Sequence, residues 1–372
     1  MIRLTFYIVI FIVFVSCDSN NDGKNEISTF SKTFGGPYTD QAYGAVGLDD
    51  GTIVIVGHSK LTPSGQFSPY ILRITSQGDT VWSKVLGENG TASGVTKSSD
   101  GAIVVAFNTN GNLSITKLET HGQLVWQKSF GPYLVGGISS TSDGGFVVCG
   151  DYLEDLFLLK TTSSGDSVWF HTYGGGNAEI GNSALQTSDG GFILMGYTRS
   201  FGAGMADGYL VKTDANGQFL WQKTYGTTAE DQTWGIKSTS DGGYIITGFS
   251  EAAGYASAYV IKTNANGDTL WTRSYPNGGN INTVLETTEG GFLLGGSTRT
   301  DGFSYPDMYL VKTTASGDTI WSRSFGGVLD ENCTRLISAQ DGGYFLIGST
   351  ASFGSGEYDI NVIKTDNMGL LH

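Results

Sequence analysis

The residues most often used in catalysis form no recognisable pattern in this chain. Its histidines, His58, His121, His171 and His372, fall at unrelated positions, and the HExxH, P-loop and GxSxG motifs are absent. The run Asp214–Gly217 offers oxygen ligands, but it is a short turn without the twelve-residue spacing of a calcium-binding loop. We therefore expect no enzyme activity, no metal and no cofactor. An active site built from scattered residues is the alternative.

Cys17 has the most specific chemistry. It follows an apolar run, Leu4–Val15, which is too short to span a bilayer but suits the core of a signal peptide. The sequence Phe14-Val15-Ser16-Cys17 resembles the bacterial lipoprotein box, in which the cysteine is acylated and becomes the new N-terminus. The resemblance implies a signal peptide over residues 1–17 and a palmitate-type anchor. It also implies an outer-membrane lipoprotein in a Gram-negative cell envelope, either periplasmic or surface-exposed. The alternative is an ordinary signal peptide with an incidental cysteine.

Residues 18–26 are polar and are predicted to form a flexible tether. The body that follows is built from an internal repeat. One series consists of tryptophans that each follow a glycine by four residues: Trp82, Trp126, Trp169, Trp221, Trp271 and Trp321. A second series consists of acids that directly precede a glycine: Asp50, Asp100, Asp143, Asp189, Asp241, Glu289 and Asp341. The two series together predict seven repeats.

The repeat that begins at Thr224 shows the elements that each unit supplies. Its β-rich runs are Trp234–Ser238, Tyr244–Gly248, Ala258–Thr263 and Leu270–Tyr275, separated by turns and one long loop, without helical periodicity. Four short antiparallel strands make one blade of a β-propeller. We therefore predict an all-β fold, a single seven-bladed β-propeller of four-stranded antiparallel blades over residues 27–372.

The two ends of the chain predict how the ring closes. Phe30–Gly36 aligns with Trp321–Gly327, with Phe30 in the tryptophan position, and the last repeat stops at His372 before its own tryptophan position. An N-terminal strand is therefore expected to complete the last blade and remove the exposed sheet edges. An open solenoid is the alternative.

A charged pair recurs in every repeat. The acid of the turn is followed, on the third strand, by a cation: Arg73, Lys117, Lys160, Lys212, Lys262, Lys312 and Lys364. One hairpin brings the two positions to the same end of the blade. We therefore expect Asp189 with Lys212, Asp241 with Lys262, Asp341 with Lys364, and their equivalents, to form a structural ladder. A charged binding ring is the alternative.

Two other repeated features are expected to be structural. The tryptophans recur in one register, which indicates packing between blades instead of a platform for sugars. Cys149 and Cys333 fall in different repeats, so we expect buried thiols and not a disulfide.

A family resemblance rests on the run Tyr209–Trp221, with Gly217 four residues before the tryptophan. This run looks like the tryptophan-docking motif of quinoprotein-type β-propellers. The units that combine it with Thr-Ser-Asp-Gly-Gly resemble propeller repeats of secreted and envelope proteins in Gram-negative bacteria. The outer-membrane assembly lipoprotein of propeller fold is a similar scaffold, usually with eight blades. The resemblance implies the fold, but the calcium site and catalytic acids of quinoprotein dehydrogenases match no residues here.

Candidate binding residues depart from the repeat or lie in long loops. A small residue precedes most turn acids by six positions, but Arg335 takes this place in the last repeat. There it either faces an anionic ligand in the central channel or pairs with Asp330 or Glu331. Long loops between second and third strands, at 199–208, 299–307 and 351–358, carry aromatic residues. The candidates are Trp234, Arg335, Tyr43, Phe201, Phe303, Tyr305 and Phe353.

Composition narrows the class of partner. Glycine accounts for 56 of 372 residues, roughly twice the usual share, but the chain is 39% hydrophobic and can bury a core. The net charge is −14 and no basic run is present, which argues against a nucleic-acid partner. We predict a monomeric, lipid-anchored binding module that takes a protein or a glycan on its loop face. A polysaccharide-acting enzyme with a site in the channel mouth and an envelope scaffold without a small ligand are the alternatives.

Overall fold

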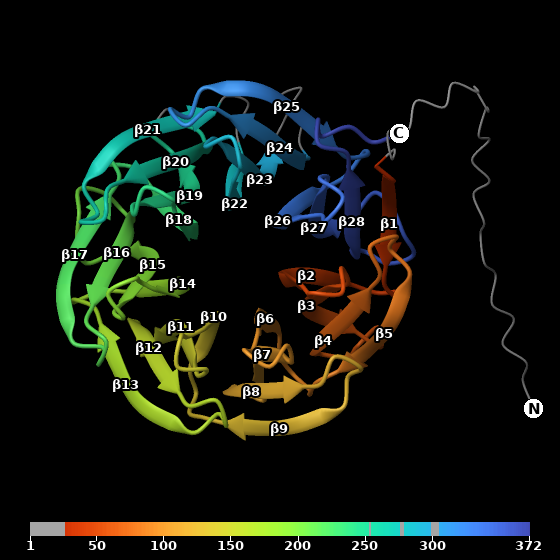
Figure 1. Cartoon of the computed structure of the whole chain (residues 1–372), viewed down its shortest axis with the longest axis horizontal. Helices are drawn as coiled ribbons and strands as arrows, with labels where there is room; N and C mark the ends of the chain where they lie inside the picture. Colours follow the sequence, from red (N-terminus) through yellow and green to blue (C-terminus); the bar gives the residue numbers. More distant parts are fainter. Residues whose placement is uncertain (1–26, 253, 276–278, 299–304) are drawn as a thin grey trace, which may run out of the picture.

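The computed structural model describes residues 27–252, 254–275, 279–298 and 305–372. It confirms the predicted fold: seven four-stranded antiparallel sheets lie around a central axis (Figure 1). Within the described part of the chain there is no helix, and so none that is long and apolar enough to cross a membrane. Residues 1–26, which include the predicted signal peptide, Cys17 and the predicted tether, lie outside the described residues.

The strands of each blade run outward from the axis in chain order, except that β1 is the outermost strand of the last blade. The innermost strands are β2 (Asp40–Gly47), β6 (Ala92–Lys97), β10 (Leu134–Ser140), β14 (Glu179–Gln186), β18 (Asp231–Ser238), β22 (Asn280–Glu286) and β26 (Glu331–Ser338). The second strands are β3 (Ile53–Lys60), β7 (Ile103–Thr109), β11 (Phe146–Tyr152), β15 (Phe192–Thr198), β19 (Tyr244–Ser250), β23 (Phe292–Thr298) and β27 (Tyr344–Thr350).

The outer half of each blade repeats the same arrangement. The third strands are β4 (Phe67–Ile74), β8 (Asn112–Leu118), β12 (Asp155–Thr161), β16 (Asp207–Thr213), β20 (Ser257–Thr263), β24 (Asp307–Thr313) and β28 (Asp359–Thr365). The outermost strands are β5 (Thr80–Val85), β9 (Leu124–Ser129), β13 (Ser167–Tyr173), β17 (Phe219–Tyr225), β21 (Thr269–Tyr275), β25 (Thr319–Phe325) and β1 (Phe30–Phe34).

The N-terminal strand closes the ring. Strand β1 lies beside β28 in Figure 1 and pairs with it in antiparallel register, Phe30 opposite Lys364. Trp221 and Lys212 are paired in the same way in the fourth blade, so Phe30 occupies the tryptophan position. Thr29 and His372 exchange hydrogen bonds of 2.9 and 3.1 Å, which join the two ends of the described chain.

The tryptophans pack between blades. The ring of Trp169 lies against Gly217 of the next blade, so close that a Cβ on this glycine would be 2.8 Å from the indole. Phe30 packs on Gly78 in the same way across the closing seam. Tyr173 donates a hydrogen bond of 2.6 Å to the carbonyl oxygen of Gly217. Tyr225 and Tyr275 donate the equivalent bonds to Gly267 and Gly317, at 2.7 and 2.8 Å.

Apolar side chains fill the interfaces between neighbouring blades. One cluster joins Val104 and Ile115 of the second blade to Phe146 and Phe157 of the third, and equivalent clusters recur around the ring. Cys149 and Cys333 are buried in two of these clusters as free thiols. Burial raises the pKa of each thiol to about 12, so both behave as small apolar side chains.

Candidate functional site

A β-bulge at the same place in every innermost strand builds a ring of side chains. In each case the register shifts over one residue that precedes the turn acid by seven positions. The skipped residues are Tyr43, Ser93, Gly136, Asn182, Trp234, Asn282 and Thr334. A bulge re-aims the side chain of the extra residue. We call these seven residues the bulge ring.

The bulge ring surrounds one mouth of the central channel. A cavity of about 240 Å³ is lined by all seven members together with Val135 and Arg335. The ring lies near the start of each innermost strand. The loops between second and third strands lie at the same end, because consecutive strands are antiparallel. The bulge ring and the long loops therefore share one face of the propeller, which we call the loop face.

The channel continues below the ring as a second cavity of about 250 Å³, lined by residues from all seven innermost strands. Small residues form much of its wall, as predicted. A Cβ on Gly94 would lie 2.8 Å from the backbone nitrogen of Ile138 in the next blade, so the backbones approach closely here. The lining residues of the two cavities include no histidine, cysteine or carboxylate.

Two aromatic side chains stand in the channel mouth. Trp234 is half-buried, and its ring centre lies 5.1 Å from that of Phe249. The Tyr43 hydroxyl donates a hydrogen bond of 2.9 Å to Gln41, and its ring lies 5.2 Å from the imidazole of His58. The two candidates therefore lie at the mouth of one channel, although they come from the fifth and first blades.

Amide groups complete the polar part of the ring. The Asn182 amide nitrogen donates a hydrogen bond of 2.9 Å to the carbonyl oxygen of Thr233. The Asn282 amide nitrogen donates to Asn332 and to the Cys333 carbonyl oxygen, at 2.8 Å each. Both nitrogens thus tie one blade to the next. Within the described chain the two amide oxygens accept no hydrogen bond, so they are available to a ligand's hydroxyl groups.

Arg335 faces the channel, and the interpretation that pairs it with Asp330 or Glu331 is wrong. Asp330 accepts a hydrogen bond of 2.9 Å from Tyr358, and Glu331 accepts hydrogen bonds from Gly327 and Thr350. The bulge at Thr334 separates Glu331 from Arg335, so Arg335 lines the channel while Glu331 is held at the blade interface. Among the residues that the structure describes, the guanidinium donates to the carbonyl oxygen of Thr334, at 2.8 Å, and pairs with no acid.

Lys237 is the second cation of the channel, and the sequence analysis missed it. It lines the same cavity as Arg335, although it comes from β18. It makes no ion pair within the described residues. Desolvation by the channel wall, and then the charge of Arg335, lower the pKa of Lys237, although its side chain keeps access to the solvent of the channel. A signal for the ring itself was present, because its members all lie seven residues before the turn acid.

The loop aromatics take different positions. Phe201 is half-buried and stacks on Tyr209 at 5.7 Å between ring centres. Tyr305 and Phe353 are each 50% exposed, and Phe303 lies outside the described residues. Val328 and Leu329, on the connection into the last blade, are 81% and 39% exposed. We call Tyr305, Val328, Leu329 and Phe353 the rim patch; the Leu329 backbone nitrogen donates to Ser352, beside Phe353, at 2.8 Å.

The predicted charged pairs form in all seven blades. The distances are 2.5 Å for Arg73–Asp50, 2.6 Å for Lys117–Asp100, 2.9 Å for Lys160–Asp143, 2.9 Å for Lys212–Asp189, 2.8 Å for Lys262–Asp241 and 2.7 Å for Lys312–Glu289; Lys364 pairs with Asp341. The cations are largely buried and the acids largely exposed. Hydrogen bonds from Lys117 and Ser98 lower the pKa of Asp100 to about 2. The ladder lies at the turn end of the blades, away from the bulge ring.

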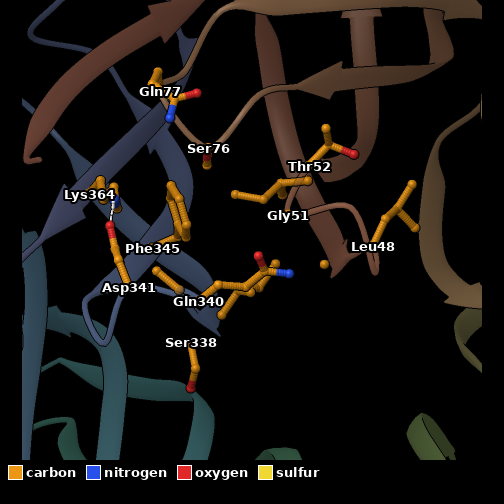
Figure 2. A pocket seen from close by; sticks show the side chains of 14 residues that line it. Leu48, Gly51, Thr52, Ser76, Gln77, Ser338, Gln340, Asp341, Phe345 and Lys364 are labelled. Atoms are coloured by element: carbon orange, nitrogen blue, oxygen red, sulfur yellow. Dashed lines mark hydrogen bonds and ion pairs between the residues drawn. The ribbon is translucent and has the colours of Figure 1, made fainter. Parts of the chain in front are cut away.

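A third cavity, of about 250 Å³, lies at this turn end in the seam between the last and first blades (Figure 2). Figure 2 shows Asp341 and Lys364 joined to each other beside the ring of Phe345. Gln340 crosses the seam and donates a hydrogen bond of 3.2 Å to the Asp49 carbonyl oxygen. The charges of this cleft neutralise one another, whereas those of the channel do not.

The channel therefore offers aromatic faces, amide groups and cations to a ligand. Within the described residues no group of three or more histidine, cysteine, aspartate or glutamate side chains is placed to hold a metal ion.

Comparisons with known proteins bear on the fold. No protein-family model matches this chain, and no curated protein is similar to it in sequence. Among solved structures, the WD40 propeller domain of Doa1 covers 91% of this chain and 96% of its own, at 13% identity and a TM-score of 0.60. Virginiamycin B lyase from Staphylococcus aureus covers 91% and 100%, at 11% identity and a TM-score of 0.56. Sqt1 from Chaetomium thermophilum, bound to the N-terminus of ribosomal protein L10, covers 90% and 98%, at 10% identity and a TM-score of 0.57. At these identities the likeness shows the β-propeller fold alone.

Proposed function

We propose that this protein is a binding module that takes a glycan at the channel mouth of its loop face. The observation that carries the proposal is the bulge ring, which brings Trp234, Tyr43, Asn182 and Asn282 to one opening. An aromatic face offers a stacking surface for a sugar ring, and convergent amides orient its hydroxyl groups. Most glycoside hydrolases use a pair of carboxylates beside the sugar. The channel lining supplies none, so the geometry favours binding.

We also propose that the propeller is held at a membrane. The apolar run before Cys17 and the lipoprotein-type sequence around this residue support a lipid anchor, followed by a tether over residues 18–26. The proposed location is the outer membrane of a Gram-negative cell envelope. In this arrangement the propeller is a monomer, joined to its lipid anchor by the proposed tether.

Labelling of cells with radioactive palmitate tests the anchor. The wild-type chain is expected to take up label and the Cys17→Ala variant is expected to lose it. Equal labelling of the two proteins would contradict the proposal, whereas a Cys149→Ala variant should label as the wild type does.

A protein partner on the loop face is the second candidate function. It is favoured by the rim patch, in which four large apolar or aromatic residues are exposed on neighbouring connections. Propellers of similar fold include Sqt1, whose structure contains the N-terminus of ribosomal protein L10. This candidate agrees with the predicted role as an envelope scaffold.

The soluble chain without residues 1–17 distinguishes the two. Binding to a glycan array is compared between the wild type, Trp234→Ala and the double variant Tyr305→Ser/Phe353→Ser. Glycan binding that is lost in Trp234→Ala and kept in the rim-patch variant supports the channel-mouth site. Absence of glycan binding, with capture of a defined envelope protein that only the rim-patch variant loses, would replace it with the protein-binding role.

A further inference from the structure

The channel carries charge of one sign only. Arg335 and Lys237 are the two charged residues among the described residues that line it. They come from β26 and β18, and they lie close enough for the charge of Arg335 to lower the pKa of Lys237. The whole chain has a net charge of −14, so an acidic protein encloses a positive channel.

Most of the other cations held in the fold are neutralised by an acid. Each buried lysine or arginine of the ladder is paired with an acid. Cations on outer strands also find acids of the next blade, for example Lys128 with Asp166 at 2.8 Å and Lys223 with Asp268 at 2.9 Å. Lys84 and Arg323, on outermost strands, donate to backbone carbonyl oxygens and have no acid partner among the described residues. The two channel cations also have no acid partner there, and they differ from Lys84 and Arg323 in lining one cavity together. Holding two like charges without a counter-charge costs free energy in the absence of a ligand.

The position of the cations indicates the shape of the ligand. Arg335 lines both the mouth and the deeper cavity, whereas Lys237 lines only the deeper one. Trp234 lies at the mouth, three residues before Lys237 on the same strand. A ligand that stacks a ring on Trp234 would therefore present its anionic group to Arg335 and Lys237 below. The planar guanidinium accepts a carboxylate, sulfate or phosphate group through two parallel hydrogen bonds.

We infer that the channel binds an anionic saccharide, a sugar that carries a carboxylate, sulfate ester or phosphate ester, with its negative group held between Arg335 and Lys237. This inference rests on the proposed glycan-binding function and specifies its ligand. The two cations supply selectivity for charge, and Trp234 with the amides of the bulge ring supplies affinity for the sugar.

The experiment measures binding by calorimetry on the soluble chain without residues 1–17. The probes are a trigalacturonate, a sulfated galactose trisaccharide, a galactose 6-phosphate and the neutral galactose trisaccharide. At least one anionic probe is expected to bind ten-fold or more tightly than the neutral one. Arg335→Gln and Lys237→Gln are each expected to lose most of this preference, and Arg335→Lys is expected to keep part of it. Raising the salt concentration should weaken the anionic probe selectively.

Stability measurements separate this role from a structural one. Without a ligand, Arg335→Gln is expected to unfold at the same or a higher temperature than the wild type, because the substitution relieves like-charge repulsion. A clear loss of stability would show that Arg335 has a structural role, and would overturn the inference.

The design also separates the inference from the proposed function. Equal affinity for neutral and anionic saccharides, with Trp234→Ala reducing both, would overturn the anionic preference and leave glycan binding intact. Failure of every saccharide to bind would overturn both. Retention of the anionic preference in the Arg335→Gln/Lys237→Gln double variant would show that the anion is held elsewhere.

Discussion

At the scale of single residues, the most unusual environment beside the channel is that of His58. Its side chain is buried, with the ring stacked on Phe67 at 4.0 Å and tilted against Tyr43 at 5.2 Å. Nδ1 lies 3.3 Å from the Thr91 hydroxyl, and Nε2 is buried without a hydrogen-bond partner among the described residues. Burial without a counter-charge lowers the pKa of His58 from 6.5 to about 4.

His58 therefore makes stability depend on pH. The unfolded chain binds this proton near pH 6.5 and the folded chain only near pH 4, so stability is lost as the pH falls through this window. The loss amounts to about 3 kcal/mol at most.

Urea unfolding of the wild type should show this decline in stability between pH 7 and pH 4, and His58→Gln should reduce the decline. His121→Gln, at an exposed histidine, is the control and should follow the wild type. Identical pH profiles for wild type and His58→Gln would contradict the assignment.

At the scale of elements, the contact between an outermost strand and the next blade is the repeated unit of cohesion. In addition to the aromatic ring on the glycine, four of the seven outermost strands carry a cation, two residues after the aromatic position, that pairs with an acid of the next blade. Lys32, after Phe30, pairs with Asp79 at 3.0 Å, and Lys223 pairs with Asp268 at 2.9 Å. Strand β1 thus makes both kinds of contact.

Two glycines give a matched test of this contact. Gly217 and Gly242 both occupy turns with positive φ, +76° and +83°. An added Cβ would lie 2.6 Å from His171 and 2.8 Å from Trp169 at Gly217, but would meet nothing within 4 Å at Gly242. Gly242→Ala should cost about 1 kcal/mol for the left-handed conformation alone. Gly217→Ala should cost roughly 1–3 kcal/mol more, because the aromatic ring must move.

Urea unfolding of the two variants provides the measurement. A Trp169→Leu background should bring the two alanine variants closer together in stability, because the leucine side chain is smaller than the indole that faces Gly217. Equal destabilisation of both variants in the wild-type background would show that the tryptophan contact contributes little.

At the scale of the whole molecule, stability depends on ring closure. The closing blade takes β1 from one end of the described chain and β26, β27 and β28 from the other. The seam also includes a backbone hydrogen bond of 2.7 Å from Asp40 to Tyr358 and one of 3.1 Å from the Thr334 hydroxyl to the Ala42 carbonyl oxygen. Without β1, strand β28 would present an unpaired edge.

Truncation tests closure. The chain of residues 35–372, which lacks β1, is compared with the chain of residues 27–372, which keeps it. The shorter chain is expected to lose more than about 3 kcal/mol of unfolding free energy, given the loss of a packed aromatic and a strand. It should also associate as its concentration rises, since β28 can pair with another copy. Thermal unfolding and light scattering provide the readouts. A shorter chain that is equally stable and monomeric would show that β1 is dispensable.

The sequence alone determined the repeated part of this protein. Turn acids, glycines and tryptophans recur in fixed register, so the number of blades, the order of strands and the alignment of Phe30 with Trp321 follow from local patterns. The partners of the ladder were also predictable, because one hairpin joins Asp241 to the strand that carries Lys262. These features depend on contacts within a blade or between consecutive blades.

Only the tertiary structure decided what meets at the channel. Trp234 and Arg335 were candidates for separate reasons, but their common site depends on the bulges. The members of the bulge ring share one distance from the turn acid, but only the structure shows that a bulge at this position redirects the side chain. The sequence does not show that Lys237 and Arg335 line the same cavity, because this depends on how the fifth and seventh blades lie around one axis. The expected pairing of Arg335 with Asp330 or Glu331 rested on their nearness in sequence, and it was wrong for the same reason. Ring closure brings strands that are distant in sequence together around the axis. Successive side chains of a strand point to opposite faces, so residues that are close in sequence can lie apart in space.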